Sequence, residues 1–89
     1  GMPMLKSYRV VVTLGETQEA AVRSLILRTL SLGGLHLSEI GVAAGEGGLD
    51  LSATVSAEGV GEAALEQAVQ RLAAEPGLMR VRWEPLEDG

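Results

Sequence analysis

The chain has 89 residues, a formal net charge of −5 and no cysteine, and 46% of its residues are hydrophobic. A chain of this length forms one domain, and its core must be aliphatic because it has no Phe, one Tyr and one Trp. The acidic balance argues against nucleic acid as a partner, and the lack of cysteine excludes disulfides, thiolate metal sites and a cysteine nucleophile. We therefore expect a cytoplasmic globular domain that binds no nucleic acid.

The amino end predicts a short leader followed by a strand. Gly1 before Met2 resembles the remnant of an expression tag, so we assign residues 1–6 to a leader, 7–86 to the domain and 87–89 to a tail. The stretch "SYRVVVTL", residues 7–14, is rich in β-branched and aromatic residues and stops at Gly15. It predicts the first strand.

From residue 17 the hydrophobic period becomes helical. Apolar residues at helical spacing predict a helix over residues 17–32, with Thr17 as its amino-terminal cap and Gly33-Gly34 as its left-handed stop. The helical positions that carry this pattern are Val22, Leu25, Ile26 and Leu30.

Two strands joined by a turn are predicted next. Residues 35–44 are apolar, but their alternation slips between Glu39 and Gly41, which indicates a bulge or an edge strand. "GEGG", residues 45–48, predicts a turn, and residues 49–57 alternate apolar and polar side chains without a break. Together they predict a hairpin with one buried and one polar face.

The last elements are a helix and a strand. Apolar residues at helical spacing predict a helix over residues 61–74, which Pro76 ends and Gly77 allows to reverse. Residues 78–84 then alternate, with Met79, Val81 and Trp83 on the face expected to be packed. The first and second halves are similar in pattern, but we find no sequence repeat between them.

The predicted order is strand, helix, two strands, helix and strand. Right-handed crossovers fold this order into a ferredoxin-like or ACT-like α+β domain, a four-stranded antiparallel sheet with both helices on one face. The other face of the sheet, which we name the open face, is either solvated or pairs with another copy or domain. It is expected to comprise Arg9, Val11, Thr13, Ser52, Thr54, Ser56, Arg80 and Arg82.

Candidates for catalysis and metal binding are few. A Ser-His-Asp arrangement would have to use the only histidine, His36, with Ser38 on the same face, but no acid stands ready as the third member. His36 and Glu39 would lie on opposite faces of a strand unless the bulge intervenes. We expect an ordinary surface histidine, no catalytic residue and no cofactor.

Acidic residues surround the predicted hairpin. Glu46, Asp50 and Glu58 could supply oxygen ligands to a hard cation such as Mg²⁺, but their spacing matches no dedicated binding loop. Solvated acids are the favoured interpretation, and we expect no metal site. Gly15 is different, because it lies between the first strand and the first helix, where ACT domains admit small ligands. It is the candidate ligand loop.

Two blocks of the chain resemble the soluble carboxyl-terminal domain of the MgtC/SapB family. In this family a Glu-x-x-x-Arg helix with a leucine-rich body precedes the second strand, and a Leu-Glu-x-x-Val-x-Arg-Leu helix leads through Glu-Pro-Gly into a strand ending in Trp. The blocks are residues 19–40 and 65–84. The matching positions are Glu19, Arg23, Leu65, Glu66, Val69, Arg71, Leu72, Pro76, Gly77, Val81 and Trp83.

This resemblance implies a cytoplasmic ACT-like domain tethered to the inner membrane by a multi-helix portion outside this chain. The family is linked with growth at low magnesium and, in some pathogens, with survival inside host cells. It supplies no catalytic motif, so the resemblance implies a regulatory role. We expect self-association or a protein partner through the open face or an edge strand; the alternative is an ACT-type sensor of an amino acid or metabolite. A small hydrolase or isomerase using His36 is the third class.

Overall fold

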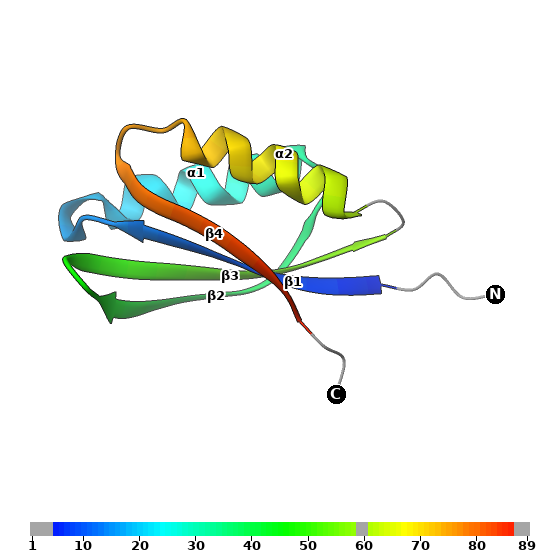
Figure 1. Cartoon of the computed structure of the whole chain (residues 1–89), viewed down its shortest axis with the longest axis horizontal. Helices are drawn as coiled ribbons and strands as arrows, with labels where there is room; N and C mark the ends of the chain where they lie inside the picture. The colour runs from blue at the N-terminus through cyan, green and yellow to red at the C-terminus, as the bar shows by residue number, and fades with distance from the viewer. Residues whose placement is uncertain (1–4, 59–60, 87–89) are drawn as a thin grey trace.

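The computed structural model describes residues 5–58 and 61–86, which form one sheet and two helices (Figure 1). The strands and helices occupy the residues expected from the sequence to within a few positions. Their bounds are β1 (Leu5–Leu14), the 3₁₀ turn η1 (Glu16–Gln18), α1 (Glu19–Leu32), β2 (His36–Gly45), β3 (Gly48–Glu58), α2 (Gly61–Ala73) and β4 (Leu78–Leu86).

The sheet has four antiparallel strands in the order β2-β3-β1-β4, and both helices cover the same face (Figure 1). This confirms the predicted ferredoxin-like, ACT-like fold. In the central pair Val10 lies opposite Ala53, and in the outer pair Val10 lies opposite Trp83. Residues directly opposite one another share a face of the sheet, so this register determines which side chains meet the helices.

The core lies between the sheet and the helix layer and is aliphatic, as composition requires. Val10, Val12 and Leu14 of β1 are fully buried against residues from both helices, including Ile26 and Leu65. Each such burial contributes about 1.5–3 kcal/mol relative to exposure. Trp83 packs on the same face, as expected: its ring stands edge-on to that of Tyr8, with the centroids 5.7 Å apart.

The two ends of α1 differ in how well the sequence predicted them. Thr17 does not cap the helix, because the chain first makes the 3₁₀ turn η1 and α1 begins without a side-chain cap. The carboxyl end follows the expected glycine stop. Gly34 has φ of 79°, its N–H donates to the Ser31 carbonyl at 3.1 Å, and Leu35 N–H donates to the Leu30 carbonyl at 3.0 Å. This is a Schellman motif.

Glycines serve different purposes at the two remaining turns. In the β2–β3 turn Gly47 has φ of 78°, and a Cβ at Gly48 would overlap the Leu14 carbonyl oxygen. After α2 the chain reverses into β4 as expected, and Gly77 does so without a positive φ. A Cβ at Gly77 would instead lie 3.0 Å from the Gln18 side-chain oxygen, so glycine leaves room for that side chain.

Both edge strands are irregular. The register of β2 shifts between Leu37 and Glu39, slightly before the position the sequence suggested. The register of β4 shifts beside the end of β1, and Met79 in that shift is 60% exposed. Met79 therefore does not share the packed face with Val81 and Trp83, as the alternation predicted, because the irregularity turns it outward.

Within the described part of the chain, neither helix has the length and apolarity required to span a bilayer.

Candidate functional site

The residues expected on the open face do share that face. Strand pairing places Arg9 between Thr54 and Glu84, Val11 between Ser52 and Arg82, and Thr13 between Asp50 and Arg80. The alternate residues of β1 belong to the core under the helices, so these three rows point away from it. Ser56 lies on the same side of the sheet, opposite Ser7 and His36.

The centre of the open face is more enclosed than a solvated surface. Val11 is only 9% exposed and Thr13 only 7%, although neither helix lies over them. Arg82 lies opposite Val11 and Arg80 lies opposite Thr13. The aliphatic part of an arginine side chain is long enough to cover such a neighbour. The Thr13 hydroxyl also donates a hydrogen bond to Asp50 Oδ1 at 2.8 Å. The middle of the face is thus ordered by its own side chains.

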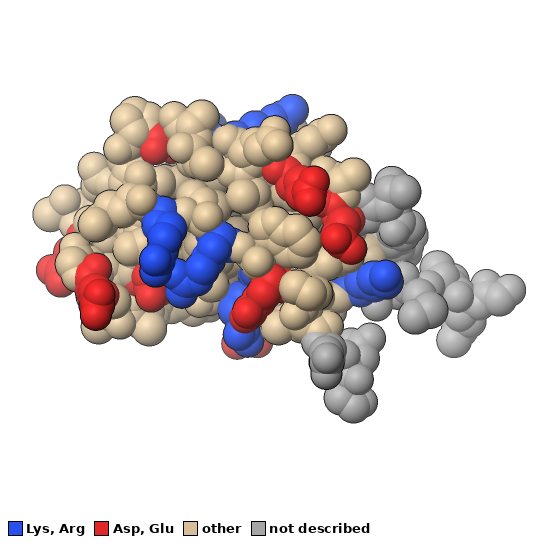
Figure 2. Space-filling view, in the orientation of Figure 1, with Lys and Arg blue, Asp and Glu red and all other residues tan. Residues whose placement is uncertain are grey.

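Charge is divided across the open face. Arg80 and Arg82 lie on β4, and Figure 2 shows basic side chains gathered along that strand. Arg9 pairs with Glu84 at 3.2 Å, with both side chains well exposed. On the opposite half, Asp50 of β3 and Glu39 of β2 carry negative charge. One half of the face is therefore mainly basic and the other mainly acidic.

The acidic half is also flat. β2 contributes Gly41 and Ala43 to the open face, opposite Ser52 and Asp50 of β3. Nothing lies within 4 Å of the position that a Cβ of Gly41 would occupy. The arginines therefore project from one half of the face, while the other half has a flat stretch at Gly41 and Ala43.

The histidine candidate is brought closer to an acid but not into a catalytic arrangement. Because the β2 register shifts at Ser38, His36 pairs with Ser56 and Glu39 with Thr54, so both lie on the open face. Ser38 donates its hydroxyl to the Thr54 carbonyl at 3.1 Å. That bond uses the hydroxyl proton which a general base would have to remove.

The three acids proposed as cation ligands do not converge. Glu46 is exposed in the β2–β3 turn, and Asp50 accepts the hydrogen bond from Thr13. Glu58 is at the far end of β3, about 26 Å from Asp50 at the usual rise of a strand, and its side chain is outside the described residues. Among residues that the structure describes, no three metal-ligating side chains cluster.

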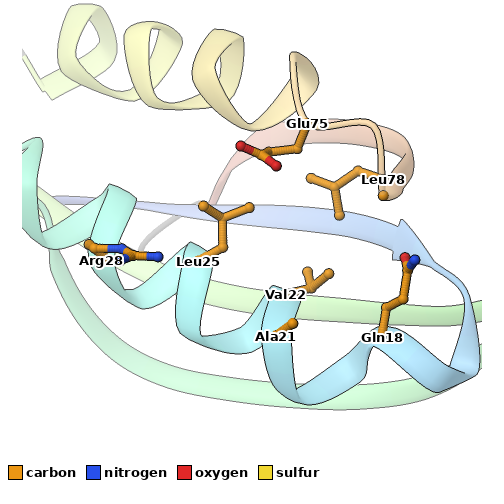
Figure 3. Close-up of a pocket in the computed structure, with 8 residues that line it drawn as sticks. Gln18, Ala21, Val22, Leu25, Arg28, Glu75 and Leu78 are labelled. Atoms are coloured by element: carbon orange, nitrogen blue, oxygen red, sulfur yellow. The ribbon is translucent and has the colours of Figure 1, made fainter.

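A groove lies on the other side of the molecule, between α1 and the turn from α2 into β4 (Figure 3). It has a volume of about 370 Å³ and an apolar floor that includes Leu25 and Leu78. Its polar groups are the Arg28 guanidinium, the Glu75 carboxylate and the Gln18 amide. Gly15 is not among the lining residues, so the groove begins one turn beyond the loop that the sequence indicated.

A second hollow of about 160 Å³ lies between the carboxyl half of α1 and the middle of α2. Arg71 and Gln67 of α2 line it together with Leu32 of α1. Neither hollow was predicted from the sequence, because each requires the relative placement of two helices. The available signal was the spacing of Ala21, Leu25, Arg28 and Leu32, which repeats along one side of α1.

Comparison with known proteins identifies a family. The sequence profile of the MgtC/SapB C-terminal domain matches residues 8–83. The chain is similar to the C-terminal domain of the MgtC protein from Mycobacterium tuberculosis, with 31% identity and a TM-score of 0.81, covering 93% of this chain and 89% of that one. Among curated protein sequences no match is found.

More distant structures share the fold alone. The ACT domain of the GTP pyrophosphokinase of Chlorobium tepidum is 14% identical with a TM-score of 0.60, covering 93% of this chain and 100% of that one. An acylphosphatase from Coxiella burnetii is 17% identical with a TM-score of 0.62, covering 96% and 86%. At such low identities the TM-scores indicate a shared architecture alone, and proteins of different activity use this architecture.

Proposed function

We propose that this chain, which belongs to the MgtC/SapB C-terminal domain family, is a non-enzymatic regulatory domain that self-associates through its open face. In the full protein it would act at the cytoplasmic side of the inner membrane, tethered by a membrane portion and serving magnesium homeostasis. The observation that carries the proposal is the division of charge and side-chain size across that face. The family match and the ACT-like neighbours support a regulatory rather than a catalytic role.

A second copy of the chain is the occupant that this division favours. We consider two copies stacked with their open faces in contact. If the two-fold axis that relates them is parallel to the strands, β4 of one copy lies over β2 of the other. The projecting Arg80 and Arg82 then meet the flat half formed by Gly41 and Ala43, next to the carboxylate of Asp50. A two-fold axis across the strands would instead bring β4 onto β4 and oppose arginines. Like charges in contact disfavour that second arrangement.

The size of the face sets the expected strength. The four strands lie about 4.8 Å apart, and each is about nine residues long with a rise of about 3.3 Å per residue. The area of the open face is therefore roughly 570 Å² per copy. Two copies would bury about 1,100 Å², which is close to the lower limit for a specific interface. The dimer should therefore be weak and depend on protein concentration.

Thr54 is the position at which to test this pairing. It is half-buried near the middle of the face, and in the in-register pair it faces Arg9 of the other copy. Thr54→Arg would oppose two guanidinium groups there and weaken association at least about tenfold, or about 1.4 kcal/mol. The control is Gln70→Arg, which adds the same charge on exposed α2, on the other side of the molecule. Equal dissociation constants for Thr54→Arg and wild type would rule out this surface.

The groove at α1 supports a second candidate, a small-molecule sensor of the ACT type. Arg28 and Glu75 place opposite charges at the margins of an apolar floor, an arrangement that suits an amino acid or a similar zwitterion. A thermal-shift panel of amino acids tests it. A ligand at 100 times its dissociation constant should stabilise the domain by about 2.7 kcal/mol, and Arg28→Ala should abolish the shift. A panel without any shift would refute the sensor.

A further inference from the structure

The two helices present equivalent side chains to the seam between them. When Glu19 is aligned with Glu62, "EAAVRSLILR" of α1 lies beside "EAALEQAVQR" of α2. The segments share their first three residues and the final arginine, and their apolar positions coincide except at Leu27, which aligns with Gln70. Comparing the sequence halves by pattern alone did not show this repeat. The fold makes it visible, because α1 and α2 occupy corresponding places in the two halves of the domain.

This equivalence produces matching stripes along the seam. The stripe of α1 is Ala21, Leu25, Arg28 and Leu32, and the equivalent stripe is Ala64, Ala68 and Arg71 of α2, continued by Glu75 in the turn after that helix. The positions within each helix follow the spacing of a single face. Residues from both stripes line the two hollows described above. The two hollows have no described lining residue in common but follow one another along α1, and we call them together the groove.

The groove combines exposed apolar side chains with positive charge. Leu32 is 75% exposed, and Leu25 is half-buried in the floor of the first hollow. Arg28 lines the first hollow and Arg71 the second, and both are exposed. Among residues 5–58 and 61–86, the two ion pairs that form use other arginines. The Glu75 carboxylate also lines the first hollow, whereas none of the described residues that line the second is acidic. The two hollows together therefore carry two guanidinium groups and one carboxylate, a positive balance in a chain whose net charge is −5.

We infer that this groove docks an amphipathic, acidic helix of a separate partner protein. An apolar stripe on such a helix would cover Leu25 and Leu32, and flanking carboxylates would pair with Arg28 and Arg71. A partner helix as long as α1, about 21 Å, is long enough to engage both hollows. A second copy of this chain is a poorer occupant, because its own seam would present the same two arginines. This surface lies opposite the open face, so the inference goes beyond the proposed self-association.

The probe is a fluorescein-labelled helical peptide with leucines along one face and glutamates on both sides of them. Its binding to the whole chain is followed by fluorescence anisotropy. We expect saturable binding that weakens about fivefold to tenfold in Arg28→Glu and in Arg71→Glu, and that weakens as salt is added. Lys6→Glu is the matched control and should bind like wild type, because Lys6 is exposed at the start of β1 and lines neither hollow. A peptide of the same composition with its leucines scrambled should not bind.

Reversing the charges on both the protein and the peptide keeps the test independent of small effects on folding. The double variant Arg28→Glu/Arg71→Glu should bind a basic version of the peptide, in which lysines replace the glutamates. The wild type should not bind this basic peptide. Failure of this rescue, or no saturable binding of the acidic peptide at millimolar concentration, would overturn the inference. So would unchanged binding in Arg71→Glu, because a ligand confined to the first hollow does not reach that residue. Loss of self-association in the double variant would assign the seam to a second copy and also overturn it.

Discussion

Gly48 provides a sharp test of how β1 and the β2–β3 hairpin fit together. A Cβ built at this position overlaps the carbonyl oxygen of Leu14, a backbone atom of the neighbouring strand. Gly48→Ala would therefore have to displace the end of β1 or the turn, and overpacking of this kind costs about 1–3 kcal/mol. The alanine would recover about 0.4–1 kcal/mol by restricting the unfolded chain, so we expect a net loss of roughly 1.3 kcal/mol.

Gly41→Ala is the matched control. Gly41 lies in β2, and its φ is not positive. No atom lies within 4 Å of the position that its Cβ would occupy. The same substitution should leave stability unchanged or raise it slightly. Thermal and urea unfolding followed by circular dichroism measure both variants. For a domain of this size the loss at Gly48 corresponds to a melting temperature lower by about 5–10 °C. Equal stability of the two variants would refute the packing described for this turn.

Three further substitutions test local features of the fold by the same unfolding measurements. Gly34→Ala should cost about 1–2 kcal/mol, because φ of 79° strains a residue with a Cβ, and a neutral result would contradict the Schellman ending of α1. Thr13→Val should cost about 1 kcal/mol by removing the hydrogen bond to Asp50, whereas a gain would show that this bond does not stabilise the open face. Glu19→Ala should cost under about 0.5 kcal/mol, since its pair with Arg23 is a partly exposed i,i+4 contact; a larger loss would show a role beyond this pair.

The sequence predicted the elements where one local pattern dominates. The unbroken alternation of residues 49–57 specified both the strand and its buried face, and the structure buries Leu51, Ala53 and Val55 as expected. Predictions failed where tertiary packing decides. Thr17 was a reasonable cap, but the chain enters a 3₁₀ turn before α1, and Met79 was expected in the packed face but falls at a register shift.

The candidate surfaces divide in the same way. Alternation along strands was enough to predict which side chains share the open face, because strand geometry fixes every second residue to one side. The enclosure of Val11 depends on neighbours in other strands, which the sequence does not order. Likewise Arg28 and Glu75 are far apart in the chain and line one groove only because α1 packs beside the turn after α2. Gly15 as a ligand loop and the exclusion of metals stay predictions.

The most direct test of self-association through the open face is the mass in solution, measured by light scattering over a range of protein concentrations with and without millimolar Mg²⁺. The account predicts a concentration-dependent dimer that is indifferent to magnesium, lost in Thr54→Arg and kept in Gln70→Arg. A wild-type chain that stays monomeric at every concentration, or a Thr54→Arg variant that dimerises as well as wild type, would contradict it. Association only in the presence of the cation would also contradict it and would point to Glu46 and Asp50 as the next residues to substitute.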